Sequence, residues 1–237
     1  MKKHLPNFLT SLNLLFGWTS IFCSFNNKFE NVFFLIAIAS IFDFFDGYIA
    51  KKLNVKSKIG GQLDSFADLV TFGIAPTIVV YNILISHYKF YDPILQITFY
   101  FFLGLIPLLS AFRLAKFNVS DQNSSEFIGL PTPAFALSSI AISLLFLDLI
   151  YYNKFLQKFI FLYPITIVFL ALLMVSRLKF ISFKFKTYNF SSNKSRYSLI
   201  FSTLLIIIIM LIFGNKLLIM PFVIAAYIIF SLVENVK

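Results

Sequence analysis

Four aspartates are the residues of this sequence best suited to chemistry, because they lie in or beside hydrophobic segments of a chain with only ten acidic residues. Asp43 and Asp46 are three residues apart and Asp64 and Asp68 are four apart, so each pair shares one face of a helix. A carboxylate in apolar surroundings is costly unless a cation meets it. The four aspartates therefore predict a metal site, and ligands that are all oxygen favour Mg²⁺ or Mn²⁺ over Zn²⁺. Two ions bridged by shared carboxylates would balance the charge.

Small residues and a cation accompany these carboxylates. Gly47 and Ala50 continue the helix face after Asp46 with almost no side chain, which lets a ligand approach the backbone closely. Gly60 does the same before Asp64, and Lys51 can neutralise part of a phosphate charge. Together these residues indicate a pyrophosphate bound through metals. A two-metal site at a membrane surface suits phosphoryl transfer, in which metal ions stabilise both the attacking and the leaving oxygen.

The elements that must position these residues are membrane helices. The chain of 237 residues is 59% hydrophobic and 13% charged, with a mean hydropathy of +0.87. In soluble domains about a quarter of the residues are charged. Hydrophobic segments approaching the roughly 20 residues that span a bilayer recur along it. We expect an all-α polytopic membrane protein with about eight transmembrane helices, in the segments 5–27, 32–50, 69–88, 93–112, 127–147, 159–176, 197–215 and 217–233.

The basic residues predict how these helices are oriented. The net charge is +10, and Lys and Arg accumulate on the cytoplasmic side of membranes. If both termini are cytoplasmic, fifteen of the twenty Lys and Arg residues face the cytoplasm. The other side keeps only Lys28, Lys89, Lys154, Lys158 and Lys216. We therefore expect an integral protein of the cytoplasmic (inner) membrane, with the aspartates facing the cytoplasm and with no nucleic-acid partner.

The chain divides into three predicted parts. Residues 1–180 form a six-helix transmembrane core that contains all the candidate chemistry, and residues 181–196 form a basic cytoplasmic loop. Residues 197–237 form a C-terminal transmembrane hairpin without buried charge. Cys23 is the only cysteine, which excludes an intrachain disulfide and a thiolate metal cluster.

Two further polar patches belong to the same membrane face as the aspartates on this topology. One holds Arg113, Lys116 and Asn118, followed by a segment in which Pro131 and Pro133 shape the start of a helix. The other is the amino-terminal set of Asn7, Thr10 and Asn13. Asn13 lies about two turns inside a helix, where an unpaired amide is costly, so a protein or substrate partner is expected. The patches and the aspartates can line one site.

The aspartate spacing resembles the signature of the CDP-alcohol phosphatidyltransferase family. That signature is Asp-x-x-Asp-Gly-x-x-Ala-Arg, eight residues, then Gly-x-x-x-Asp-x-x-x-Asp. The matching residues are Asp43, Asp46, Gly47, Ala50, Lys51, Gly60, Asp64 and Asp68. Only Lys51 departs from it, because the family usually has Arg there; the charge is kept and the planar two-point grip on phosphate is lost.

The resemblance implies roles for these residues. The four aspartates would hold two divalent cations on the pyrophosphate of CDP-diacylglycerol. Gly47, Ala50, Lys51 and Gly60 would contact the CDP group. Asp68 would act as the general base that takes the proton of the acceptor hydroxyl while CMP leaves. The family also implies a homodimer.

The acceptor is suggested by a second resemblance, to the members of this family that use serine. It covers Asp64-Ser65 and Phe72-Gly73-Ile-Ala-Pro76, the stretches around residues 113–118 and 129–134, and the amino-terminal patch. L-serine carries a carboxylate, for which the planar fork of Arg113 is suited. Arg113, Lys116 and Asn118 are thus candidate serine ligands, and Asn7, Thr10, Asn13 and Ser65 are candidate pocket residues. The expected products are phosphatidylserine and CMP.

Other interpretations remain open at this point. The same chemistry could use glycerol 3-phosphate or an inositol phosphate, although phosphorylated acceptors should need a denser basic cluster beside the aspartates. A divalent-cation transporter would also place carboxylates in the membrane. Against a transporter, the aspartates cluster at one face, and no acidic residue continues across the bilayer. Anchoring at the cytoplasmic surface is the alternative for Arg113 and Lys116.

Overall fold

The protein is helical almost throughout. The computed structural model describes residues 4–55, 57–119, 127–153, 155, 159–180, 193–212, 214 and 219–235. The helices are α1 (Leu5–Phe25), α2 (Phe29–Lys52), α3 (Lys58–Asp68), the π-helix η2 (Leu69–Ile74), α4 (Ala75–His87), α5 (Pro93–Val119), α6 (Thr132–Tyr152), α7 (Leu162–Val175), α8 (Lys194–Ile212) and α9 (Ile219–Asn235). Two short strands, β1 (Phe127–Ile128) and β2 (Lys179–Phe180), pair antiparallel.

The prediction of an all-α polytopic membrane protein is confirmed. Within the described residues, five helical rods are long and apolar enough to cross a membrane: 5–25, 29–52, 59–87, 93–119 and 132–152. Three shorter apolar helices, in 162–175, 196–212 and 221–231, follow them. Each of the eight predicted segments thus corresponds to a helical rod. The third rod joins α3, η2 and α4 without a break, so Asp64 and Asp68 lie on a membrane-crossing rod.

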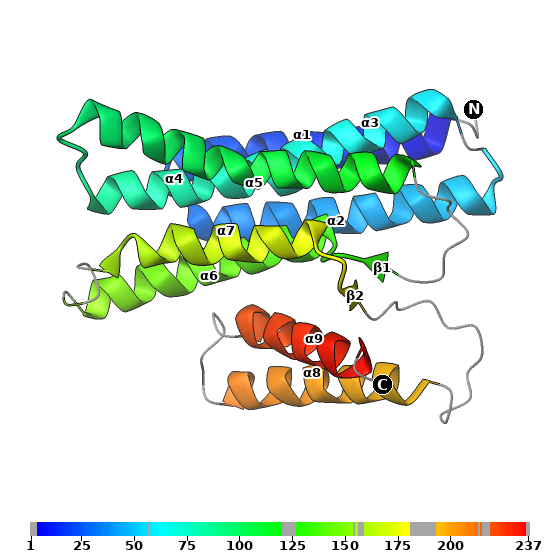
Figure 1. The fold of residues 1–237 in the computed structure, drawn as a ribbon. Helices are drawn as coiled ribbons and strands as arrows, with labels where there is room; N and C mark the ends of the chain where they lie inside the picture. Colours follow the sequence, from blue (N-terminus) through cyan, green and yellow to red (C-terminus); the bar gives the residue numbers. More distant parts are fainter. Residues whose placement is uncertain are drawn as a thin grey trace.

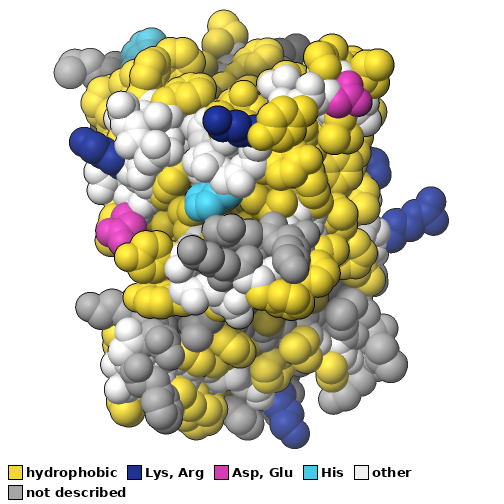
Figure 2. Space-filling model, turned by 90° about the vertical axis from the view of Figure 1, so that its left-hand side faces the viewer, with side chains coloured by type: hydrophobic (Ala, Val, Ile, Leu, Met, Phe, Trp, Pro, Cys, Tyr) yellow, Lys and Arg dark blue, Asp and Glu magenta, His cyan; other side chains and the backbone are white. Residues whose placement is uncertain are grey.

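The rods lie roughly parallel and have two distinct ends (Figure 1). The start of α1, the end of α2, the start of α3 and the end of α5 meet at the right-hand end, where the chain also begins. Figure 2 looks onto the opposite end, where hydrophobic side chains predominate and the charged side chains that are drawn lie scattered. The candidate chemistry therefore gathers at one end of the molecule.

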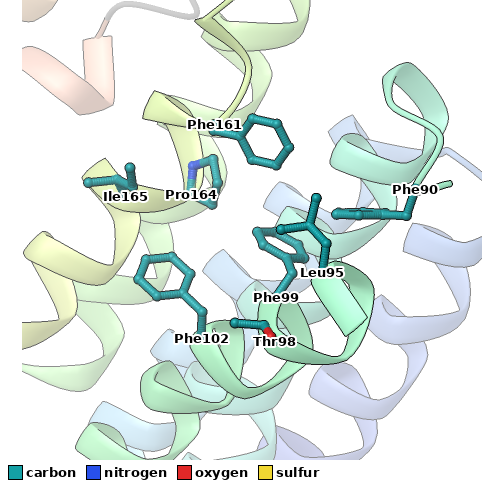
Figure 3. A pocket seen from close by; sticks show the side chains of 8 residues that line it. All are labelled: Phe90, Leu95, Thr98, Phe99, Phe102, Phe161, Pro164 and Ile165. Atoms are coloured by element: carbon teal, nitrogen blue, oxygen red, sulfur yellow. The ribbon is translucent and has the colours of Figure 1, made fainter. Parts of the chain in front are cut away.

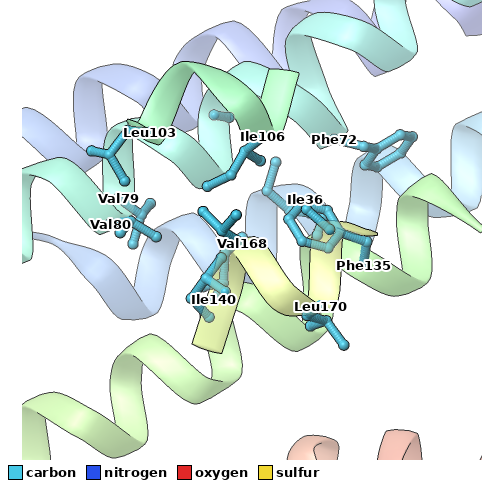
Figure 4. Packing of buried hydrophobic residues seen from close by; sticks show 14 of the residues in the cluster. Ile36, Phe72, Val79, Val80, Leu103, Ile106, Phe135, Ile140, Val168 and Leu170 are labelled. Carbon is cyan, nitrogen blue, oxygen red and sulfur yellow. The ribbon is translucent and has the colours of Figure 1, made fainter. Parts of the chain in front are cut away.

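The core of the first six rods is a layer of aliphatic and aromatic side chains. Figure 4 shows members of this core from α2, η2, α4, α5, α6 and α7: Ile36, Phe72, Val79, Ile106, Ile140 and Val168. All of these are buried. In a membrane such packing is driven by van der Waals contact more than by exclusion of water, because lipid is as apolar as the core.

Small residues let the π-helix approach its neighbours closely. A Cβ added to Gly17 of α1 would lie 2.1 Å from Thr71 Oγ1 and 2.8 Å from Thr71 Cα. A Cβ on Gly73 would lie 3.1 Å from Ser110 Oγ of α5. Close helix contacts through Gly, Ser and Thr are typical of membrane proteins. They hold η2, which begins directly after Asp68, between α1 and α5.

One helix starts later than its pattern predicted. The hydrophobic segment 127–147 is helical only from Thr132, because Gly129 has a φ of 80° and Pro131 precedes the helix. Residues 127–128 instead pair with 179–180. The division into parts at 180 and 196 stays a prediction, and residues 181–192 of the predicted basic loop lie outside the described residues.

Candidate active site

Three of the four aspartates lie together. The carboxylates of Asp43 on α2 and of Asp64 and Asp68 on α3 each offer an oxygen, and these oxygens all lie within 4.8 Å of one another. Asp68 is only 7% exposed, and the other two are half-buried. The expectation that the paired faces of two helices meet across the short loop 53–57 is met for these three residues.

The fourth aspartate lies outside this close group. Asp46 is 4% exposed and accepts a hydrogen bond of 2.6 Å from the hydroxyl of Thr10, itself buried on α1. It sits one turn beyond Asp43 on the same helix. A charge-assisted bond of this kind compensates a buried carboxylate in part. Thr10, a predicted pocket residue, therefore ties α1 to the acidic face of α2.

Asn13 has the partner that its buried position required. Its Nδ2 donates to Asp68 Oδ1 at 3.1 Å, while its Oδ1 is buried and has no hydrogen-bond partner among the described residues. The backbone oxygen of Asn13 accepts from the hydroxyl of Thr71 at 3.2 Å. Asn13 is thereby held between η2 and Asp68. The π-helix fits this role, since single π turns within helices recur at functional sites.

The donor set suits a hard divalent cation. Three carboxylates converge, and Asp64 Oδ1 is buried without a hydrogen-bond donor in the described part of the chain. Buried carboxylate oxygens are ordinarily paired, so an oxygen left without a donor beside two other carboxylates fits a bound cation. Carboxylate oxygens alone match Mg²⁺ or Mn²⁺. No His or Cys belongs to this group.

The predicted nucleotide-contacting residues lie beside the aspartates on α2 and α3. A Cβ on Gly47 would meet nothing within 4 Å, so the backbone there is open to a ligand. Gly60 is different, because a Cβ would lie 2.8 Å from Asn7 Oδ1 and 2.9 Å from Ser57 Oγ. Gly60 N donates to Ser57 Oγ, the N-cap of α3. The absence of a Cβ at Gly60 thus allows α3 to pack closely against Asn7 of α1.

The other residues of the nucleotide group are more exposed. Ala50 is half-buried, and Lys51 is exposed at the last turn of α2. Cations at a helix C-terminus are favourable because the helix dipole is negative there. Both residues follow Asp46 within about one and a half turns. They lie at the end of the molecule where the aspartates gather.

Arg113 lies near enough to Asp43 and Asp68 to interact with their charges. Its Nη1 donates to Thr132 Oγ1 at 3.1 Å, and its Nε is buried without a hydrogen-bond partner among the described residues. The guanidinium also interacts electrostatically with Asp68 and Asp43. An arginine that only anchors a helix at the membrane surface would be solvated. The environment of Arg113 favours a site residue over an anchor.

The remaining acceptor candidates, Lys116 and Asn118, differ in their contacts. Asn118 Nδ2 donates to Ser65 Oγ at 2.8 Å, so these two predicted residues join α5 to α3 just outside the acidic group. Both Asn118 and Lys116 are exposed. The structure therefore brings Asn118 and Ser65 together and leaves Lys116 at the rim.

Sequence reasoning missed two polar partners. Thr132 is completely buried and accepts the hydrogen bond from Arg113, yet the pattern around it indicated only a helix start between two prolines. The signal available in the sequence was the polar Thr132 between Pro131 and Pro133, at the start of a helix on the same membrane face as Arg113. Thr71 supports Asn13, and nothing in its apolar surroundings in the sequence pointed to it.

The apolar pocket in Figure 3 is not part of this site. It has a volume of about 250 Å³ and lies between α5 and α7, at the end opposite the aspartates. Phe90, Phe99 and Phe161 dominate its lining, and only Thr98 adds a side-chain polar atom. It holds no group for acid, base or metal chemistry.

Comparisons with known proteins agree with this geometry. The model of the CDP-alcohol phosphatidyltransferase family matches residues 3–170. A CDP-diacylglycerol–serine O-phosphatidyltransferase of Bacillus subtilis is 33% identical over 182 residues, covering 77% of this chain and 92% of its own. The enzyme of that name from Helicobacter pylori is 29% identical over 231 residues, 97% of this chain and 90% of its own. That of Methanocaldococcus jannaschii is 34% identical, covering 74% and 73%.

Proposed function

Because this chain belongs to the CDP-alcohol phosphatidyltransferase family, we propose that it transfers the phosphatidyl group of CDP-diacylglycerol to the hydroxyl of L-serine. The products are phosphatidylserine and CMP. The observation that carries the proposal is the convergence of Asp43, Asp64 and Asp68, whose carboxylate oxygens lie within 4.8 Å of one another. Arg113 interacts electrostatically with Asp68 and Asp43. The serine-specific names of the relatives support the choice of acceptor.

The aspartates form the metal-binding part of the proposed site. Asp43, Asp64 and Asp68 would hold divalent cations with Asp46, and two Mg²⁺ or Mn²⁺ ions would balance the four carboxylates. When bound, such ions supply positive charge to the pyrophosphate oxygens and to the leaving CMP. The open backbone at Gly47 leaves room for the nucleotide against α2, and Lys51 adds charge for its phosphates.

Asp68 is the proposed general base. The serine hydroxyl oxygen forms a bond to the phosphorus on the lipid side, the bond from that phosphorus to the CMP oxygen breaks, and the hydroxyl proton passes to Asp68. Asn13 donates to Asp68 Oδ1, which fixes the orientation of the carboxylate and leaves its other oxygen for the proton. The low exposure of Asp68 keeps bulk water away from the attacking position.

Arg113 is the proposed ligand of the serine carboxylate. Its Nη1 donates a hydrogen bond to Thr132, while the buried Nε has no acceptor among the described residues. Part of the guanidinium fork is therefore available to a carboxylate. Asn118 and Ser65, bonded to each other at the rim, would close the acceptor side. Serine would thus bind next to Asp68, with its hydroxyl toward the base.

The acceptor is tested by CMP release from CDP-diacylglycerol with the purified protein. L-serine, glycerol 3-phosphate and an inositol phosphate are compared as acceptors. We expect serine-dependent release, and release only with a phosphorylated acceptor would refute the serine assignment. Arg113→Ala should raise the KM for serine about ten- to a hundredfold, the cost of losing a hydrogen bond between charged groups. The matched control is Arg177→Ala before β2. It truncates an exposed arginine side chain without removing a backbone hydrogen bond of this segment, and it should leave this KM unchanged.

Metal dependence is tested on the same preparation. Chelation should abolish CMP release, and Mg²⁺ or Mn²⁺ should restore it. Full activity after thorough chelation would argue against a metal-assisted reaction. A transporter is tested by measuring metal uptake into proteoliposomes that contain no CDP-diacylglycerol, where we expect none.

A further inference from the structure

The C-terminal hairpin packs against the elements near Arg113, the proposed acceptor ligand. It consists of α8 and α9, which lie beyond the residues matched by the family model. The two helices pack on each other, and α9 also packs against α6 and β2 (Figure 1). The sequence had indicated no chemistry for this hairpin. Its contacts place one polar side chain near Arg113.

Residues 127–130, which precede α6, are hydrogen-bonded to the end of α7 and to the residues that follow it. We call residues 127–130 and 173–180 the clasp. Within it β1 pairs with β2, Gly129 N donates to Leu178 O at 2.9 Å, and Leu130 N donates to Leu173 O at 2.9 Å. Gly129 is held tightly, since a Cβ there would lie 2.1 Å from Met174 O. The clasp fixes where α6 begins, and hence the position of Thr132.

Arg113 depends on the clasp through Thr132. Among the described residues, Arg113 makes one hydrogen bond to a side chain, from Nη1 to Thr132 Oγ1 at 3.1 Å. One such bond leaves the guanidinium plane free to rotate about it. A planar carboxylate ligand needs a fixed plane, because two parallel hydrogen bonds form only in one orientation.

Tyr227 of α9 is the side chain that meets both the clasp and Arg113. It is 9% exposed, and its ring stacks on Phe180 of β2 with the centroids 5.5 Å apart. Tyr227 and Arg113 also interact electrostatically. Stacking on Phe180 needs only the ring, whereas the electrostatic interaction with Arg113 arises at the hydroxyl, the polar atom of this side chain.

We propose that Tyr227 is a positioning residue for the acceptor site, whose hydroxyl orients the Arg113 guanidinium to receive the carboxylate of the acceptor. The proposal rests on the proposed function, in which Arg113 binds serine. It gives the hairpin a role in acceptor recognition. The donor site, built on α2 and α3 at the aspartates, does not involve Tyr227.

The test is Tyr227→Phe in the full-length protein, which removes the hydroxyl and keeps the ring on Phe180. CMP release is measured against serine and against CDP-diacylglycerol. We expect the KM for serine to rise about three- to tenfold, the range of one hydrogen bond, with kcat and the KM for CDP-diacylglycerol within twofold of wild type. Tyr163→Phe is the matched control, because it removes another buried hydroxyl, bonded to Ser143 in the membrane and remote from Arg113.

An unchanged serine KM in Tyr227→Phe would overturn the proposal, as would an equal change in Tyr163→Phe. A double-mutant cycle with Arg113→Lys adds a second readout: we expect the two effects on KM to be non-additive, and full additivity contradicts the proposed link. If wild-type protein releases CMP with another acceptor and not with serine, the serine assignment fails by itself. The Tyr227 variant is then measured with that acceptor, and its KM decides this proposal separately.

Discussion

Asp68 is the carboxylate with the most complete protein environment in the site. Asn13 donates to one of its oxygens, Asp43 and Asp64 lie beside it, and Arg113 interacts with its charge. A group so placed can take a proton and hold a metal at once. We expect Asp68→Asn to lower kcat by about 10²- to 10⁴-fold, the usual contribution of a general base, while substantial binding of CDP-diacylglycerol remains. The rate of CMP release and the binding of the lipid nucleotide are measured side by side.

The matched control for this substitution is Asp148→Asn. Asp148 is exposed near the end of α6, away from the aspartate group. It undergoes the same chemical change and should keep wild-type turnover. Wild-type turnover in Asp68→Asn would remove Asp68 from the role of base.

Asn13 is expected to act through Asp68 and not through either substrate. Asn13→Ala deletes the bond to Asp68 Oδ1 and should lower kcat about tenfold with little change in either KM, because only the orientation of the base is lost. Asn82→Ala is the matched control. Asn82 is a buried asparagine on α4 that donates to Ser24 of α1, and it lies farther along the same two rods, away from the aspartates. It should lower thermal stability and spare kcat. A raised KM for CDP-diacylglycerol in Asn13→Ala would instead make Asn13 a donor ligand.

Residue spacing predicted most of this site, and the exceptions have physical causes. Helical periodicity placed Asp43, Asp64 and Asp68 on facing surfaces, and the cost of burying an amide predicted that Asn13 has a partner. Spacing did not separate Asp46 from the others, because that depends on the hydroxyl of Thr10 on a third helix. Contacts between distant segments leave no local pattern.

At the scale of elements, the crossing of α1 with η2 sets the position of Asn13. Gly17 lies against Thr71, whose hydroxyl also bonds the backbone of Asn13. Gly17→Ala would gain up to about 1 kcal/mol of helix propensity. Its Cβ, however, would lie 2.8 Å from Thr71 Cα, a backbone atom that no rotamer change can move. The overpacking cost of about 1–3 kcal/mol should exceed the gain in helix propensity, so we expect a lower melting temperature and a lower kcat.

Gly104→Ala is the matched control for this crossing. Gly104 is an exposed glycine inside α5, and a Cβ there meets nothing within 4 Å. Thermal unfolding in detergent should therefore show Gly104→Ala at or above the wild-type melting temperature and Gly17→Ala below it. Equal melting temperatures in the two variants would contradict this prediction, because they would show that α1 and η2 move apart at little cost.

Hydrophobic segments predicted every rod but not every boundary: the third rod begins before the predicted residue 69, α5 continues past residue 112, and α6 begins after residue 127. The apolar run from Phe127 continued the pattern of a membrane helix, yet Gly129 and Pro131 end any helix there, and residues 127–128 pair with 179–180 instead. The pairing joins segments about fifty residues apart, and two-residue strands carry no periodicity of their own. Phe180, at the end of this pairing, stacks on Tyr227 of α9. A contact between segments so far apart in the sequence leaves no local pattern, so the sequence indicated no chemistry for the C-terminal hairpin.

At the scale of the whole molecule, the helices separate two chemically different ends. The aspartates, Arg113 and Asn118 gather at one end, and the apolar pocket of Phe90 and Phe161 lies at the other. A transfer between a nucleotide-linked lipid and a soluble amino acid needs the first end in contact with the cytoplasm. The distribution of basic residues predicts that orientation, which is a property of the chain in its membrane.

The two ends of α5 test this orientation directly. Tyr91, just before α5, is 90% exposed, and Val119 at its other end is 89% exposed, so a cysteine at either position should react equally fast with a maleimide in detergent. Both substitutions are made in a Cys23→Ser background, because Cys23 is the only native thiol. With a membrane-impermeant maleimide, Tyr91→Cys should be labelled in intact cells and Val119→Cys only in inverted vesicles. The opposite pattern would place the aspartates outside the cytoplasm, where no pool of CDP-diacylglycerol headgroups and serine is expected to meet them, and would refute the proposed reaction at that face.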